Sequence, residues 1–132
     1  LADPALQGRS VVLALHYPVV DRRGAIYEGS AHGLLNARAL IRVLADAPTR
    51  PTMVLHGHQH HGYRGAIALP DGTTVTSFDC GSSGYAYLPD LGRAAAMAVY
   101  EVDAGELVGV ERYLYDGERF SPEPGGAFAT GR

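Results

Sequence analysis

The stretch MVLHGHQHH, residues 53–61, decides both the fold and the chemistry that this chain can carry. It opens as a short apolar run of the kind that forms a buried strand and ends in four histidines within six positions. Imidazole is the commonest metal ligand among neutral side chains, and it titrates near physiological pH. Gly57 lets the backbone turn sharply between the strand and His58. The stretch therefore predicts a strand that delivers imidazoles to a metal ion.

A second element of the same kind lies upstream. The run VVLALHYP, residues 11–18, is again apolar and delivers His16 at its end. Between the two runs, apolar residues at helical spacing after Asn36 predict a helix that ends before Pro48. A strand, a helix and a strand in this order form a parallel βαβ unit, which brings His16 to the same sheet edge as His58 and His60. Three imidazoles at that edge suit Zn²⁺, Mn²⁺ or Fe.

The rest of the chain predicts antiparallel structure. Residues 63–69 and 74–78 read as one hairpin, and residues 96–102 and 107–115 as another. The long segment 17–35 reads as a connection, and residues 117–132 show no periodicity and read as a loosely ordered tail. The predicted fold class is α/β, with a short parallel βαβ unit followed by antiparallel strands.

The composition limits the number of domains, the kinds of partner and the cysteine chemistry that we expect for this chain. The 132 residues are 46% hydrophobic, which is enough for one domain with a core, and the net charge of −3 argues against a nucleic-acid partner held by a basic surface. No apolar run approaches the length of a membrane span. A single cysteine, Cys80, excludes an internal disulfide and a cysteine zinc cage. These features lead us to expect a cytoplasmic protein with no membrane partner.

The two histidine elements resemble the last two motifs of the calcineurin-like metallophosphoesterases. In that family a strand ends in histidine near a proline, and after a crossover helix another strand ends in G-H-x-H, as Gly57-His58-Gln59-His60 does here. Tyr17 stands where the family often has a second histidine. The resemblance covers about residues 10–85. It implies the C-terminal half of an α/β/β/α sandwich, with residues 1–116 forming a partial metallophosphoesterase domain.

The resemblance also implies a dinuclear centre of Mn, Fe or Zn that hydrolyses phosphate mono- or diesters. His16 and His58 would bind one ion and His60 the other. The family's earlier motifs, D-x-H, G-D and G-N-H-[DE], do not occur here. They carry the bridging carboxylate and the histidine that protonates the leaving group, so we expect no leaving-group acid in this chain. We expect the chain alone to be inactive, and to associate with the missing N-terminal half or with another copy of itself.

Three further residues are candidates for contact with a phosphate-ester substrate. Tyr17 follows a predicted ligand, Arg64 lies four residues beyond His60, and His32 lies in the long connection. A guanidinium can form a bidentate hydrogen-bonded pair with a phosphate. Arg64 is the best placed of the arginines for such a contact, because it is the one that follows His60 closely in the sequence. Surface exposure without a function is the competing interpretation for Arg64 and His32, and packing is the competing one for Tyr17.

Two other functions remain open at this point. The stretch from His56 to His61 is similar to the H-x-H-x-D-H motif of the metallo-β-lactamase superfamily, with His60 in place of the aspartate. That reading gives no role to His16. The other alternative is a non-catalytic half-fold that serves as an interaction module, and the absence of the carboxylate motifs supports it.

Overall fold

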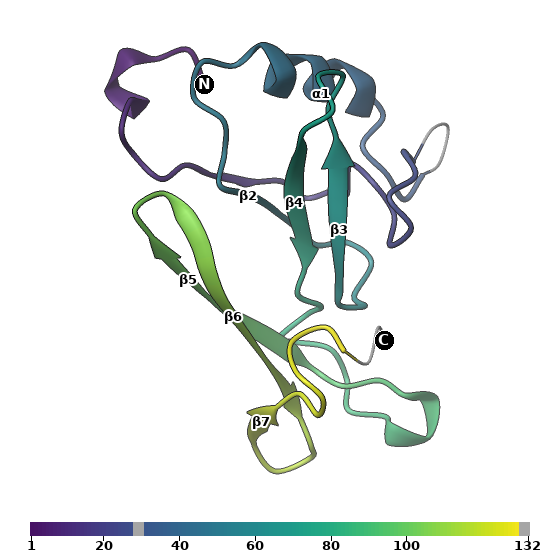
Figure 1. The fold of residues 1–132 in the computed structure, drawn as a ribbon. Coiled ribbons are helices and arrows are strands. Elements are labelled where there is room, and N and C mark those ends of the chain that lie inside the picture. Colours follow the sequence, from purple (N-terminus) through teal and green to yellow (C-terminus); the bar gives the residue numbers. More distant parts are fainter. Residues whose placement is uncertain (28–30, 130–132) are drawn as a thin grey trace.

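The protein is described by a computed structural model that covers residues 1–27 and 31–129. The strands of this part of the chain form two sheets, and an α-helix lies against the first (Figure 1). The strands are β1 (Val12–Ala14), β2 (Met53–His56), β3 (Tyr63–Ala68), β4 (Thr74–Asp79), β5 (Ala96–Asp103), β6 (Glu106–Tyr115) and β7 (Phe120–Pro122). The helices are α1 (Ala37–Asp46) and the 3-10 turns η1 (Pro4–Leu6) and η2 (Pro89–Leu91).

The first sheet is mixed, with the strand order β1-β2-β4-β3. Strand β1 pairs with β2 in parallel, and α1 lies between them in the chain, as the sequence predicts. Strands β3 and β4 form the predicted antiparallel hairpin. Strand β4 also pairs with β2 in parallel, which sets His56 opposite Asp79 in the register. The predicted α/β class, with a parallel unit followed by antiparallel strands, is confirmed at this level of detail.

The core lies between α1 and one face of this sheet. Ile41 and Leu44 of the helix pack against Val54 of β2 and Ile67 of β3. The last three of these side chains have no exposed surface. Each large apolar side chain buried in this way contributes about 1.5–3 kcal/mol relative to an exposed position. This layer fixes β1 and β2 side by side, and with them the loops that carry the histidines.

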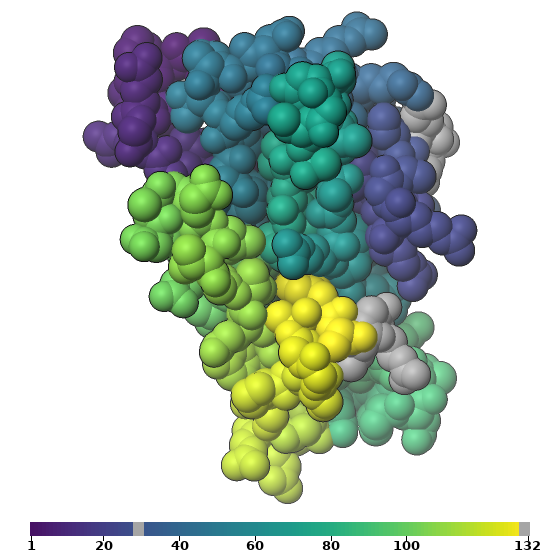
Figure 2. All heavy atoms as spheres, viewed as in Figure 1, coloured from purple at the N-terminus to yellow at the C-terminus, as the bar shows by residue number. Residues whose placement is uncertain are grey.

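The second sheet has the order β5-β6-β7 and is antiparallel throughout. It meets the face of the first sheet opposite α1. There the Phe78 ring of β4 lies 5.1 Å from the Tyr100 ring of β5 and 5.4 Å from the Phe128 ring, measured between centroids. In Figure 2 the C-terminal segment, in yellow, lies between the first sheet and the β5–β6 hairpin. The described chain is therefore layered as helix, sheet and sheet.

The segment from residue 117 differs from the loose tail that the sequence predicts. It contains β7, which pairs with β6, and beyond that strand Glu123 is only 4% exposed. The reason is a buried ion pair between Glu123 and Arg112, with Oε1 and Nη1 3.0 Å apart, which no apolar periodicity reveals. Residues 130–132 of the predicted tail lie outside the described part of the chain.

The long connection 17–35 starts inside the core. Val19 and Val20 are at most 1% exposed, and the carbonyl of Val20 accepts a hydrogen bond of 2.9 Å from the Tyr63 hydroxyl. The helix follows at the predicted position. Asn36 is its N-cap residue, but among the described residues its side chain makes no capping hydrogen bond. Residues 28–30 of the connection lie outside the described part.

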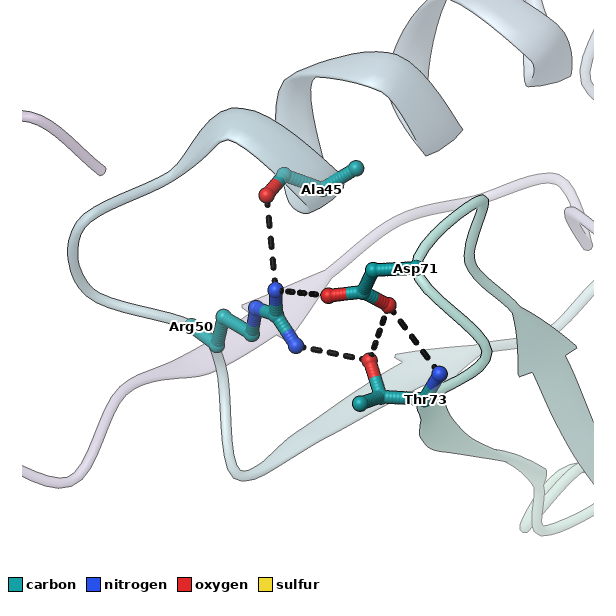
Figure 3. A network of polar contacts seen from close by, with 4 residues as sticks. All are labelled: Ala45, Arg50, Asp71 and Thr73. Carbon is teal, nitrogen blue, oxygen red and sulfur yellow. Dashed lines mark hydrogen bonds and ion pairs between the residues drawn. The ribbon is translucent and has the colours of Figure 1, made fainter.

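A polar network holds the end of α1 to the β3–β4 turn (Figure 3). The guanidinium of Arg50 donates to the Ala45 carbonyl, to the Asp71 carboxylate and to the Thr73 hydroxyl. The Thr73 hydroxyl and backbone N–H also donate to Asp71. These hydrogen bonds from Thr73, followed by that from Arg50, lower the pKa of Asp71 to about 2. The network fixes the turn at the end of the sheet remote from the histidines.

None of the helices in the described residues has the length and apolar character that crossing a membrane requires.

Candidate metal centre

The structure brings His16 and His58 together at one edge of the first sheet. His16 lies two residues after the end of β1 and His58 two residues after the end of β2, and the two strands are parallel neighbours. The His16 Nε2 and His58 Nδ1 atoms are 3.2 Å apart. The Gly57 N–H donates to the His16 carbonyl at 3.2 Å, which joins the two strand ends through the backbone as well.

A separation of 3.2 Å between two imidazole nitrogens has two possible chemical interpretations. One nitrogen can donate its hydrogen to the other. Alternatively, both can bind one ion, because two nitrogens at about 2.0–2.1 Å from a tetrahedral Zn²⁺ lie about 3.3 Å from each other. The distance between the two nitrogens is therefore compatible with a hydrogen bond and also with a shared ion.

The backbone at this edge is strained. His58 and His60 have φ angles of 75° and 59°, which lie in the left-handed region. A residue with a Cβ atom costs about 1–2 kcal/mol in this conformation. Strained residues of this kind concentrate at functional sites, where the surrounding structure holds them in place. Two histidines with this conformation within three positions favour a functional interpretation of the loop.

The surroundings of His58 favour its neutral form. Desolvation, followed by the neighbouring imidazoles of His16, His32 and His60, lowers the pKa of His58. The Asp79 carboxylate acts in the opposite direction but is the smallest of these causes. A histidine must lose its proton before it binds a metal, so the lowered pKa leaves His58 ready to bind one at neutral pH.

His60, which follows two residues after His58, makes a different ring contact. Its ring lies against the Tyr85 ring, with centroids 5.2 Å apart. Within residues 1–27 and 31–129, no three side chains of His, Cys, Asp or Glu are grouped closely enough to hold an ion. The described residues thus fit a pair of ligands for one ion, whereas the two-ion centre that the resemblance implies does not fit on them alone.

Of the three predicted substrate residues, two lie beside the histidines. The Tyr17 ring is 4.5 Å from the His58 ring and 4.8 Å from the His16 ring. The His32 ring is 5.7 Å from the His58 ring, and the His32 carbonyl accepts a hydrogen bond of 3.1 Å from Gln59. These contacts place Tyr17 and His32 next to any group held by His58.

Arg64 lies elsewhere. Its guanidinium is 5.8 Å from the centroid of the Phe78 ring, on the side of the first sheet that faces the second. It lines a cavity of about 300 Å³ together with Phe78, Phe128 and the residues 107–110 of β6. The structure therefore places Arg64 in the space between the sheets rather than beside His16 and His58.

Sequence reasoning missed Asp79, which is fully buried at the end of β4. Its Oδ1 accepts a hydrogen bond of 2.9 Å from the Gly81 N–H, and its Oδ2 lies 3.7 Å from His56 Nδ1. In the described part of the chain, Oδ2 and both ring nitrogens of His56 have no hydrogen-bond partner. In the sequence, Asp79 is only an acidic residue at the end of a predicted strand. Its position beside His56 becomes evident only when β4 is known to pair with β2.

The buried position of His56 bears on the similarity to the metallo-β-lactamase motif. Its side chain has no exposed surface, and its ring lies 5.3 Å from that of Tyr63, on the face of the sheet that α1 covers. The metallo-β-lactamase reading requires His56 and His58 to face the same ion. The structure instead pairs His58 Nδ1 with Nε2 of His16, at 3.2 Å.

No family model matches the chain, and no curated protein matches it either.

Proposed function

We propose that the chain contributes the histidine ligands of a metal-dependent phosphoesterase that hydrolyses phosphate mono- or diesters. In this proposal His16 and His58 bind one divalent ion, and His60 is a ligand of a second. The observation that carries the proposal is the 3.2 Å approach of His16 Nε2 and His58 Nδ1 at the carboxyl ends of adjacent parallel strands. Open α/β sheets bind their ligands at this edge.

The chain's own residues have defined tasks in this proposal. The lowered pKa of His58 keeps its imidazole available as a ligand. The backbone hydrogen bond from Gly57 to His16 sets the distance between the two strand ends. The rings of Tyr17 and His32 flank His58. A bound divalent ion would supply Lewis-acid polarisation of the phosphoryl oxygen.

The remaining ligands of the proposed centre come from polypeptide outside these residues. This part of the proposal follows from the absence of the D-x-H, G-D and G-N-H-[DE] motifs from the sequence. It is also supported by the absence of any group of three possible ligands among the described residues, because an ion needs further donors beyond one or two imidazoles. We derive no catalytic step through the two ions, since the described residues do not hold them.

The first test measures metal binding by this chain. Calorimetric titration with Zn²⁺ and visible absorption with Co²⁺ should show one ion bound, and His16→Ala and His58→Ala should each weaken binding by at least tenfold. His61→Ala is the matched control, because His61 is an exposed histidine of the same loop that the proposal leaves out of the site. Unchanged binding in both His16→Ala and His58→Ala, with folding verified by circular dichroism, would contradict the ligand assignment.

The second test measures hydrolysis. The complete gene product that contains this chain, supplied with Mn²⁺ or Zn²⁺, should hydrolyse p-nitrophenyl phosphate or its bis ester. The same two histidine variants should lose that activity while the control keeps it. A complete protein that binds metal through His16 and His58 but hydrolyses neither ester would favour the non-catalytic interaction module.

A further inference from the structure

A cavity of about 270 Å³ opens beside His60, between η2 and the far end of β6. Its wall consists mainly of aromatic and basic side chains, among them His60, His61, Tyr85, Tyr87, Arg93 and Tyr115. Its volume lies just below the range of about 300–1,000 Å³ that is typical of sites for small organic molecules. The cavity therefore suits one compact ring system rather than an extended ligand.

The aromatic wall is held in place by specific contacts. The Tyr87 and Tyr115 rings meet edge to face, with centroids 5.6 Å apart and an angle of 83° between their planes. The Tyr115 hydroxyl donates a hydrogen bond of 2.8 Å to the Gly117 carbonyl. Gly117 itself has a φ of 108°, and a Cβ atom there would lie 2.8 Å from Tyr87 Cε1. Glycine at this position leaves the room that the Tyr87 ring occupies.

Tyr85 links this wall to the histidine loop. One neighbour of its ring is His60, at 5.2 Å between centroids, and another is the guanidinium of Arg93, at 5.8 Å from the centroid. Arg93 is exposed at the cavity, so its charge faces solvent as well as the ring. The cavity that a planar group would enter is lined by a tyrosine ring and a guanidinium, and both kinds of group favour stacking.

The other charges of the wall are already engaged. Arg112 is 3% exposed, and its guanidinium donates to the Cys80 carbonyl and to Glu123. The Asp116 carboxylate accepts hydrogen bonds from the backbone N–H groups of Glu118 and Arg119, which lower its pKa. Arg93, by contrast, lines the cavity and is exposed there.

We propose that this cavity binds the planar aromatic part of a phosphate ester, of the size of a nucleobase, while the phosphate lies at His60. The inference rests on the proposed function, because it is His60 that joins the cavity to the candidate metal centre. It deepens that function by naming the substrate class as phosphate esters with an aromatic ring, such as nucleotides. Stacking of one base on aromatic side chains contributes about 1–3 kcal/mol, or roughly a 5- to 150-fold gain in affinity.

The test compares two ligands that differ only in the base. The affinities of adenosine 5′-monophosphate and ribose 5-phosphate are measured by calorimetry on the Zn²⁺-loaded chain, and that of adenosine alone on the metal-free chain. The nucleotide should bind more tightly than the sugar phosphate. Tyr85→Ala should reduce this preference at least fivefold and leave the affinity for ribose 5-phosphate unchanged, whereas Tyr85→Phe should retain it.

Two further variants make the outcome decisive. Tyr87→Ala tests the same wall if Tyr85→Ala does not fold, and Tyr113→Ala is the control, because Tyr113 lies on β6 outside the cavity. Equal affinity for the two phosphates, or a preference that neither wall variant reduces, would overturn the inference. If metal binding proves independent of His16 and His58, the proposed function fails. The adenosine titration then still decides whether the cavity accepts the base.

Discussion

The substitution Glu123→Gln should destabilise this protein strongly, although it changes a carboxylate to an amide of nearly the same shape. Glu123 Oε1 accepts from Arg112 Nη1 at 3.0 Å, and Oε2 accepts from the Phe128 backbone N–H at 2.6 Å. Both partners are donors. In either orientation, the amide –NH₂ of glutamine would therefore face a donor and lose one of the two hydrogen bonds.

The magnitude follows from burial. The Arg112 and Glu123 side chains are 2% and 0% exposed, so the substitution leaves a guanidinium buried without its counter-charge. Removal of one partner of a buried ion pair costs about 3–5 kcal/mol. For a domain of this size that corresponds to a fall of about 10–20 °C in Tm. The second sheet and the C-terminal segment should loosen first, because the pair joins β6 to that segment.

The assay is urea unfolding followed by far-ultraviolet circular dichroism, with Arg112→Met and the double variant Arg112→Met/Glu123→Met completing a mutant cycle. The double variant should be more stable than the sum of the single losses predicts, since it leaves no unpaired charge. Asp71→Asn is the control, because it breaks an ion pair whose side chains are 38% and 42% exposed. A Glu123→Gln protein no less stable than the Asp71→Asn protein would refute the reasoning.

Three further outcomes are expected. The pKa of Asp71 is lowered from 3.8 to about 2 in the folded state, so its contribution to stability is complete above about pH 4 and is lost as the pH falls through 2; the Tm difference between the wild type and Asp71→Asn should shrink over that range, and a constant difference would contradict it. A Cβ at Gly62 would lie 2.2 Å from Arg112 Cζ, and this guanidinium is held by its hydrogen bonds, so Gly62→Ala should cost about 1–3 kcal/mol in urea unfolding, while Gly84→Ala, with open space around it and no positive φ, should not displace any neighbour. Since His58 has a φ of 75°, His58→Gly should be about 1 kcal/mol more stable than His58→Ala although both lose the ligand, and equal stability would argue against backbone strain there.

Local pattern was sufficient for the elements that depend on local contacts. The alternation from Tyr63 and the turn at residues 70–73 predict the β3–β4 hairpin, which the structure has, with every second residue of β3 buried. The apolar runs that precede His16 and His58 predict two parallel neighbours, and the amphipathic segment between them predicts the crossover helix. In each case a few consecutive residues contain the pattern that predicts the element, which is either the spacing of the apolar residues or the residues that form a turn.

Long-range contacts explain what the sequence did not predict. The parallel pairing of β4 with β2 places Asp79 beside His56, but neither strand contains a signal that specifies this partner. The ion pair between Arg112 and Glu123 joins two polar residues that a pattern-based reading assigns to the surface. The cavity wall likewise depends on how the segment around Tyr85 folds back toward β6, which no local periodicity encodes.

The most direct test of the account is the position of a metal ion in crystals of this chain grown with Zn²⁺, located by anomalous scattering at the zinc edge. The account predicts an ion bonded to His16 Nε2 and His58 Nδ1, at about 2.0–2.1 Å from each nitrogen. An ion held by His56, His58 and His61, or no ion at His16 and His58 at saturating Zn²⁺, would contradict it.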